Sequence, residues 1–298
     1  MNGKSAIMES IGGGLWPAAL LAALLLPFLA GCGSGDTTGP GLEREIVVFG
    51  YLYVNETVSD DLAIFLSRTM PVDEYYSLDD AVVTDALVTL WKEGAESPDT
   101  LAMVRPGYYA NPAVAIEPVT TYHLRVEAGG EDPINATTTT PWPFEVFSEP
   151  RVLPDSMAHS AIADSFPIYL DCEFDDQVFL VDAYCLEDWE DAKYVEAIGP
   201  EEGPVDYDEY GGDNGQPRHI APYFRVKGLE RENGHYRLGW YGDLFVFYGD
   251  YDIQVLSVDE NYYNYLYRDH PELNGGVEGG IGVFGSACRK AWRVRAVE

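Results

Sequence analysis

Hydrophobic and polar residues alternate with a period of two from about residue 43 onward, as in half-buried β-strands. Six strand-length runs, rich in β-branched and aromatic residues, occupy the first part of this region: EIVVFGYLYV, DLAIFLSR, DALVTLWK, TLAMVR, TYHLRVE and INATTTT. The turn-forming segments EGAESPD, RPGYYANP and EAGGEDP separate several of them. This pattern predicts an antiparallel β-sandwich of immunoglobulin-like size over residues 45–147.

A second set of strand-length runs follows the proline-rich segment PWPFEVFSEPRVLP, which we interpret as leading into a linker over residues 148–157. These runs are SFPIYLDCEF, QVFLVDAYCLE, RHIAPYFRV, HYRLGWYG, DLFVFYG and YDIQVLSV. A long acidic insertion over residues 187–217 interrupts them. We therefore predict an all-β protein with two antiparallel β-sandwich-type domains, the second over residues 158–298.

Near the C-terminus the hydrophobic period changes to that of a helix. Ser257 and Glu260 have the spacing of a capping box, and Tyr263, Leu266 and Tyr267 then fall on one helical face. Pro271 is expected to end this short helix.

A glycine-rich stretch, GGVEGGIGVFGSA, follows the predicted helix. We predict a structural role for Gly279, Gly280, Gly282 and Gly285, which would let the backbone bulge or pass close to the helix. A phosphate-cradling loop is the functional alternative, but it requires a helix after the glycines. The segment AWRVRAV that follows is typical of a strand, which favours the structural role.

The N-terminus has the pattern of an export signal. An uncharged apolar run over residues 15–30 is interrupted by two prolines and is followed at once by a cysteine, which predicts a signal peptide over residues 1–31. Residues Leu29 to Cys32 resemble the bacterial lipobox, in which the cysteine thiol is acylated with palmitate-type chains. A flexible tether over residues 32–44 would then join the lipid to the folded protein. In the sorting rule of proteins with this motif, aspartate directly after the acylated cysteine favours retention in the inner membrane. Gly33 stands at this position, which favours the outer membrane as the destination.

The net charge of −32, from 50 acidic and 18 basic residues, argues against nucleic acid as a partner. No cofactor is expected from the sequence motifs. The alternating acids Asp206, Asp208 and Asp213 near a Gly-Gly pair loosely resemble a calcium loop. Pro217 stands where a bidentate glutamate would be needed, so an EF-hand is rejected. A weak Ca²⁺ site and a solvated acidic loop both stay open.

Three cysteines, Cys172, Cys185 and Cys288, remain beyond the lipobox. The turn DDQ between two strand-length runs predicts a β-hairpin in which Cys172 and Cys185 point to opposite faces. We therefore expect free thiols rather than a disulfide between these two residues.

No catalytic motif is present, and the five histidines lack partners at motif spacing. This predicts a non-catalytic protein. An envelope hydrolase that cleaves glycans or peptides with acidic residues of the second domain is the alternative.

The order of several motifs along the chain resembles domain of unknown function 4249, an uncharacterised family of Gram-negative envelope lipoproteins. The matching segments are IVVFGYL at 46–52, LSRT at 66–69, ALVTL at 86–90, GYY at 107–109, TYHLRV at 121–126 and GGIGVFG at 279–285. Thr120 departs from the glycine usual before the TY strand, and the acidic insertion is longer than usual. The resemblance implies a lipid-anchored binding or accessory protein in the cell envelope. A TonB-dependent-type nutrient receptor of the outer membrane would be its partner.

Overall fold

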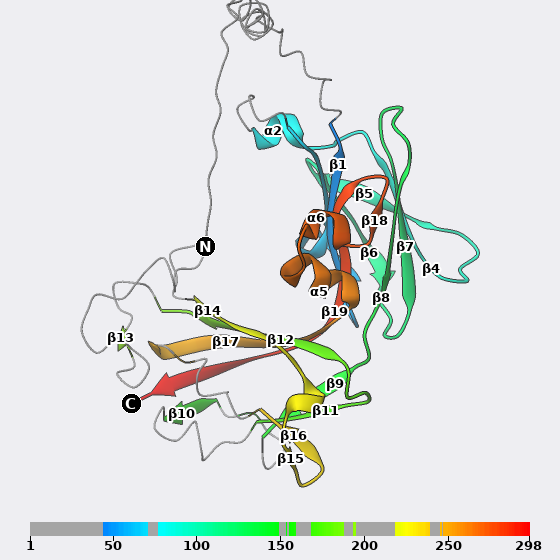
Figure 1. The fold of residues 1–298 in the computed structure, drawn as a ribbon. Coiled ribbons are helices and arrows are strands. Elements are labelled where there is room, and N and C mark those ends of the chain that lie inside the picture. Colours follow the sequence, from blue (N-terminus) through cyan, green and yellow to red (C-terminus); the bar gives the residue numbers. More distant parts are fainter. Residues whose placement is uncertain are drawn as a thin grey trace, which may run out of the picture. The chain divides into compact units, whose positions relative to one another are not determined.

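Most of the residues described in the computed structural model belong to β-strands, which confirms the predicted all-β class (Figure 1). The structure describes residues 44–70, 77–148, 153, 155–158, 168–187, 193–194, 218–238, 245 and 247–298. The predicted signal peptide, Cys32 and most of the tether lie outside these ranges, as does nearly all of the acidic insertion.

The first eight strands form one part of a large sheet whose interior carries the alternating hydrophobic residues. They are β1 (Ile46–Tyr53), β2 (Thr57–Val58), β3 (Ile64–Arg68), β4 (Leu87–Lys92), β5 (Asp99–Arg105), β6 (Tyr108–Ala115), β7 (Thr121–Glu127) and β8 (Ile134–Thr139). Neighbouring strands run in the order β1-β3-β6-β5-β4-β7-β8. Along β1, Ile46, Val48 and Leu52 are buried in the first hydrophobic cluster, while the side chains on the opposite side of the strand are more exposed. The period-two pattern therefore places every second side chain of β1 in this core.

The remaining strands extend this sheet and form a second one. They are β9 (Phe144–Phe147), β10 (Ser156–Ala158), β11 (Tyr169–Cys172), β12 (Val178–Cys185), β13 (Lys193–Tyr194), β14 (Arg218–Arg225), β15 (Arg231–Glu232), β16 (His235–Arg237), β17 (Phe247–Val258), β18 (Val277–Glu278) and β19 (Ile281–Val297). The large sheet continues as β14-β12-β17-β19-β1, and a four-stranded sheet has the order β15-β16-β11-β9. The second hydrophobic cluster draws side chains from both sheets, such as Leu170 of β11 and Val181 of β12.

The 17-residue strand β19 connects the two parts of the large sheet (Figure 1). Its first half pairs in parallel with β1, from Val47 opposite Ile281 to Tyr53 opposite Ala287. Its second half pairs antiparallel with β17, and its last residues pair in parallel with β10. The purely antiparallel arrangement expected from the sequence is therefore wrong at β19. Strand β19 belongs to the predicted second domain but pairs with β1 of the predicted first domain, and residues 44–298 group as one compact unit.

Three local expectations also need correction. The strands on either side of the DDQ turn do not pair with each other, because β11 pairs with β9 and β16 while β12 pairs with β14 and β17. The segment RPGYYANP is not only a turn, since most of it belongs to β6. The proline-rich segment before the linker contains β9, which lies at the edge of the small sheet. An edge position leaves room for the flanking prolines, which cannot donate ladder hydrogen bonds.

Helices are few and short among the described residues. They are α2 (Leu78–Ala81), α5 (Glu260–Tyr267), α6 (Pro271–Asn274) and the 3-10 turns η2 (Asp60–Leu62) and η3 (Val226–Gly228). The predicted C-terminal helix corresponds to α5, and Pro271 begins α6 rather than ending α5. Proline is well suited to the first turn of a helix, where its missing N–H has no intrahelical acceptor.

Candidate functional site

Two groups of predicted site residues fall outside the part of the chain that the structure describes. These are Cys32, the predicted lipid attachment point, and the calcium candidates Asp206, Asp208 and Asp213. Among the described residues, no group of three or more His, Cys, Asp or Glu side chains is arranged to hold a metal ion. None of the helices in that same part of the chain is both long and apolar enough to span a membrane.

The predicted structural glycines lie where β19 begins, and two of them closely approach carbonyl oxygens of strand β1. A Cβ atom on Gly282 would lie 2.1 Å from the carbonyl oxygen of Val48, and the residue has φ +115°. A Cβ atom on Gly280 would lie 2.8 Å from the carbonyl oxygen of Ile46. Only glycine allows the backbone to approach this closely, and at Gly282 the positive φ also favours glycine. Gly279 has φ +81° near Pro133, so its backbone also favours glycine.

Gly285 pairs with Tyr51 of β1, but a side chain at this position would point toward helix α5. A Cβ atom there would lie 3.1 Å from the Cβ of Tyr262 and 3.2 Å from Oδ1 of Asp259. The two residues between these glycine positions, Val283 and Phe284, are fully buried. The glycine-rich stretch therefore brings β19 close to a strand at one point and close to a helix at another.

Helix α5 begins at an aspartate rather than at the predicted serine. Asp259 is the N-cap, and its Oδ1 accepts a hydrogen bond of 3.0 Å from the backbone N–H of Tyr262. Ser257, the residue predicted to cap the helix, is a fully buried member of β17. The capping box was misplaced by two residues because aspartate at the next candidate position is an equally good cap.

The N-terminus of α5 also supplies hydrogen bonds to β19 that a neighbouring strand would otherwise make. The Ser286 N–H donates to Oδ1 of Asp259 at 2.9 Å, and the Ser286 carbonyl accepts from the Asp259 N–H at 3.0 Å. The Phe284 carbonyl accepts from Nδ2 of Asn261 at 2.9 Å, and its N–H donates to the Gly275 carbonyl at 2.8 Å. These contacts satisfy backbone groups that would be costly to bury without partners.

A small polar network holds this junction together. Thr138 of β8 donates a hydrogen bond from Oγ1 to Oδ2 of Asp259 at 2.6 Å and lies 2.8 Å from Oγ of Ser286. Burial raises the pKa of Asp259, while the hydrogen bonds from Thr138, Ser286, Tyr262 and Asn261 act in the opposite direction. Asp259 therefore joins α5, β8 and β19 through one side chain.

Aromatic side chains gather on the surface beside α5, and we call this group the aromatic face. It consists of Phe49, Tyr51 and Tyr53 on the outward side of β1, together with Tyr262 and Tyr265 of α5. The rings of Tyr51 and Tyr262 are 4.3 Å apart, and those of Phe49 and Tyr265 are 5.8 Å apart. Phe49 keeps 39% of its surface exposed, so the face is open to solvent at that end.

Only part of the helical face predicted from periodicity packs, because Tyr263 lies against a small hydrophobic cluster that includes Leu180 and Leu256. Leu266 is 48% exposed and Tyr267 is 40% exposed, and no residue of α5 is fully buried. Tyr262 packs against β1 because the Asp259 cap fixes the direction in which the helix leaves the sheet.

One hollow of about 300 Å³, the β1 hollow, lies along the outer side of β1 and β3. Phe49, Tyr51, Phe65 and Tyr108 line it, with Arg105 at its border. The Arg105 guanidinium lies 3.9 Å from the centre of the Tyr108 ring, a favourable cation–π contact.

A second hollow of about 340 Å³, the α5 pocket, lies between α5 and the outer side of β12 and β17. Tyr53 lines both hollows. In the α5 pocket, Tyr53 and Tyr262 share a hydrogen bond between their hydroxyl groups. Burial raises the pKa of Tyr262 well above its ordinary value, and neighbouring tyrosines and Asp182 raise it further. Tyr262 therefore stays a neutral hydrogen-bond donor at physiological pH.

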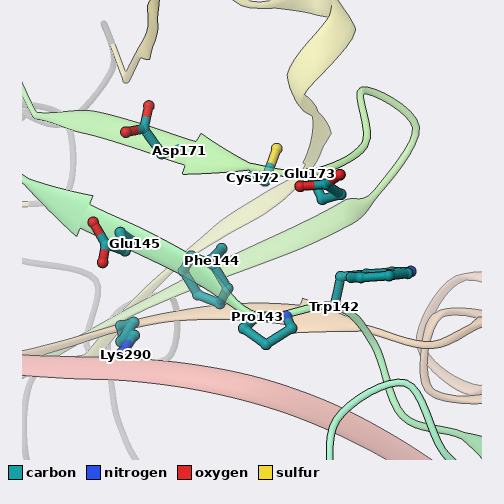
Figure 2. Close-up of a pocket in the computed structure, with 8 residues that line it drawn as sticks. All are labelled: Trp142, Pro143, Phe144, Glu145, Asp171, Cys172, Glu173 and Lys290. Carbon is teal, nitrogen blue, oxygen red and sulfur yellow. The ribbon is translucent and has the colours of Figure 1, made fainter.

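A third hollow, of about 560 Å³, lies between the small sheet and β19 (Figure 2). Figure 2 shows Asp171 and Glu145 on neighbouring strands at one end of it, Trp142 at the other, and Lys290 projecting from β19. Asp171 and Glu145 are directly opposite each other across β11 and β9. Nδ1 of His235 lies 2.5 Å from Oδ1 of Asp171. Carboxylates from two neighbouring strands and a lysine of β19 therefore line the same hollow.

The three described cysteines are free thiols. Cys185 and Cys288 are buried, and burial raises the pKa of both. Cys172 lines the third hollow, and burial together with Asp175 raises its pKa to about 11. A thiol with so high a pKa carries almost no thiolate at neutral pH and is a poor nucleophile.

Comparison with known families identifies the chain. The family described as Domain of unknown function (DUF4249) matches residues 42–290. The chain belongs to this family. The match covers most of the described residues, including the aromatic face and the whole glycine-rich stretch, and it confirms the resemblance to this family seen in the sequence motifs.

Two other comparisons add little to this assignment of the DUF4249 protein. No curated protein matches the sequence. Among solved structures, the crystal structure of chicken CNTN1 FN1-FN3 domains is similar at 8% identity and a TM-score of 0.19, covering 85% of this chain and 66% of that chain. The chain thus spans slightly less than two thirds of that structure, and a TM-score this low supports no comparison of sites.

The sequence did not reveal two of these groupings. The pair Asp171 and His235 comes from strands far apart in the chain, and no motif spacing connects them. The aromatic face combines β1 with α5, which are far apart in the chain and come together where β1 pairs in parallel with β19. The alternation of Phe49, Tyr51 and Tyr53 on the exposed side of β1 was the one signal present in the sequence.

Proposed function

We propose that this DUF4249 protein is a lipid-anchored, non-catalytic binding protein of the cell envelope that works beside an outer-membrane nutrient receptor. The anchor would be the acylated thiol of Cys32, following the lipobox-like sequence at residues 29–32. A flexible tether of this composition would allow the folded part to reach a partner in the same membrane.

One observation carries the proposal: two hollows lined by aromatic rings meet at Tyr53 on one surface of the protein. Tyrosine, phenylalanine and arginine are enriched at binding surfaces, where they combine a large apolar area with a polar or charged group. Phe49 is 39% exposed although it is a large apolar residue, which fits a surface that is covered in a complex.

Affinity capture of the full-length lipidated protein from gently solubilised envelopes tests the proposal. We expect co-purification of a TonB-dependent-type receptor, with recovery reduced at least fivefold by Phe49→Ser. The matched control is Phe174→Ser, because Phe174 is similarly exposed at 43% but lies against Trp142, away from the aromatic face. Equal recovery of the receptor with both variants would mean that the aromatic face is not the contact.

The anchor requires a separate test. Cys32→Ala should abolish incorporation of a fatty-acid analogue during growth, because acylation needs the thiol. If Cys32→Ala incorporates as much of the analogue as the wild type does, the proposed anchor is wrong. The binding surface would then be tested by the capture experiment alone.

The third hollow favours a second candidate, an envelope hydrolase acting on glycans or peptides. Asp171 and Glu145 face each other across two strands, and His235 contacts Asp171. Paired carboxylates can act as acid and base in glycoside hydrolysis. If the purified protein cleaves envelope glycans or peptides, and Glu145→Gln and Asp171→Asn each abolish cleavage, the hydrolase replaces the binding protein as the proposed function.

A further inference from the structure

The α5 pocket has a floor made by two neighbouring strands. Leu180 of β12 is opposite Leu256 of β17, and Asp182 is opposite Gln254. Alternate residues of β12 point into the second hydrophobic cluster, so Leu180, Asp182 and Tyr184 share the other face. The floor is therefore apolar at one end and carries a carboxylate and an amide at the other.

Aromatic rings from three different elements surround this floor. Tyr53 comes from β1, Tyr184 from β12, and Tyr262 and Tyr267 from α5. Asp182 is close enough to Tyr262 to raise the pKa of its hydroxyl, which places a negative charge next to the rings. The pocket volume of about 340 Å³ is in the range of small-molecule sites.

We propose that the α5 pocket binds a small organic cation, an ammonium or quaternary ammonium compound, between its tyrosine rings and Asp182. A cation over the face of a tyrosine is attracted by the ring, and this attraction grows when water is excluded. The carboxylate supplies the counter-charge, and the two leucines contact the carbon atoms of the ligand. The proposal rests on the proposed binding function and names the ligand class that the protein would take.

Charge on the rest of the protein favours a cationic ligand over an anionic or neutral one. The chain has a net charge of −32, and such a surface raises the local concentration of cations. The protein already uses this kind of contact internally, since the guanidinium of Arg289 lies 4.7 Å from the centre of the Tyr53 ring. Glu56 holds that arginine through contacts of 2.5 and 2.7 Å, so its charge is balanced outside the pocket lining.

Isothermal titration calorimetry of the full chain in detergent, with choline as the probe, tests the inference. The control ligand is 3,3-dimethylbutan-1-ol, which has the shape of choline without its charge. We expect choline to bind at least tenfold more tightly than the alcohol. Equal affinity for the two ligands would show an apolar pocket, and no saturable binding of choline would show no cation site; either result overturns the inference.

Two variants assign the binding to this pocket. Asp182→Asn keeps the shape of the side chain but removes its charge, and Tyr267→Ala removes a ring that is 40% exposed and contributes little to the core. Each should weaken choline binding at least fivefold. Asp252→Asn is the matched control, because Asp252 lies on β17 and pairs with Arg293 at 3.0 Å without lining the pocket. A loss of binding equal in Asp252→Asn and Asp182→Asn would overturn the assignment.

The same variants separate this inference from the proposed function. If Asp182→Asn loses choline but still captures the receptor, both proposals stand. If the wild-type protein captures the receptor without binding choline, the cation site is wrong and the receptor-associated function stands. If it binds choline but captures no receptor, the cation site stands and the receptor association falls.

Discussion

The two halves of strand β19 differ in how deeply they are buried and in the residues that they carry. From Gly282 to Cys288 every residue is buried, whereas from Arg289 to Val297 only Val294 and Ala296 are buried. The first half is made of small or apolar residues, and the second half carries four basic residues. A strand that is covered on both faces does not alternate hydrophobic and polar residues. It has glycine where a neighbouring backbone approaches closely.

Hydrogen bonding differs between the halves in the same way. The second half pairs with β17 along its length, from Gly249 opposite Ala296 to Val258 opposite Ala287. The first half pairs with β1 on one edge, and Asp259, Asn261 and Gly275 satisfy its other edge. The start of α5 thus takes the position of a strand, and this arrangement holds the aromatic face beside β1.

Substitution of a glycine in the first half should have the largest effect on stability. Gly282→Ala places a methyl group 2.1 Å from the Val48 carbonyl oxygen at a φ of +115°. We expect a loss of about 3 kcal/mol or more in the free energy of unfolding, or failure to fold. Ala291→Thr, on an exposed position of the second half, should change it by less than about 0.5 kcal/mol in denaturant titrations. Similar losses for both variants would contradict the difference between the halves.

Part of this comparison could be predicted from the sequence. The alternation of Ile46, Val48 and Leu52 gave the buried face of β1, and the clustered glycines indicated a close backbone approach. The partner of that approach could not be predicted, because the parallel pairing of Val48 with Gly282 joins residues that are distant in the chain. Local patterns contain no information on such long-range register.

The orientation of α5 shows why the aromatic face was missed. The apolar spacing of Tyr263, Leu266 and Tyr267 indicated one packing face, but Leu266 and Tyr267 are exposed. The side chains of Asp259 and Asn261 form hydrogen bonds to β19 that set which face meets the sheet. Polar contacts of this kind override a weak hydrophobic stripe, and hydrophobic periodicity does not report them.

Removal of the Asp259 side chain should have the next largest effect. Asp259→Ala leaves the N–H groups of Tyr262 and Ser286 without their side-chain acceptor and removes one of the two hydrogen-bond partners of the Thr138 hydroxyl. We expect a loss of about 2–3 kcal/mol in the free energy of unfolding. Asp259→Asn should lose about 1 kcal/mol or less, because its oxygen can still cap the helix.

The matched control for Asp259 lies in the second half of the sheet. Asp252→Asn breaks an exposed ion pair with Arg293 and should change the free energy of unfolding only slightly. A loss for Asp259→Ala no larger than that for Asp252→Asn would show that the junction is not a major support of the fold.

A smaller effect is expected from pH. Burial raises the pKa of Asp259 in the folded protein above its ordinary value of 3.8, so the folded state takes up a proton before the unfolded chain does. The contribution of Asp259 to stability should therefore rise as pH falls from 7 toward 4. Measuring the free energy of unfolding of the wild type and of Asp259→Asn across this pH range isolates this contribution. The stability of the wild type should increase relative to that of the variant as the pH falls. A stability difference between wild type and variant that does not change with pH would mean that Asp259 has the same pKa in the folded and unfolded states.

The most direct test of the role of α5 as a substitute strand is amide hydrogen exchange at Ser286. Its N–H donates to Asp259 in the first half of β19, whereas the amide of Val294 lies in the second half, beside β17. In Asp259→Ala, global destabilisation lowers the protection of both amides, but only Ser286 also loses its acceptor. The account predicts that protection at Ser286 falls at least tenfold more than at Val294. An equal fall at the two amides would contradict it.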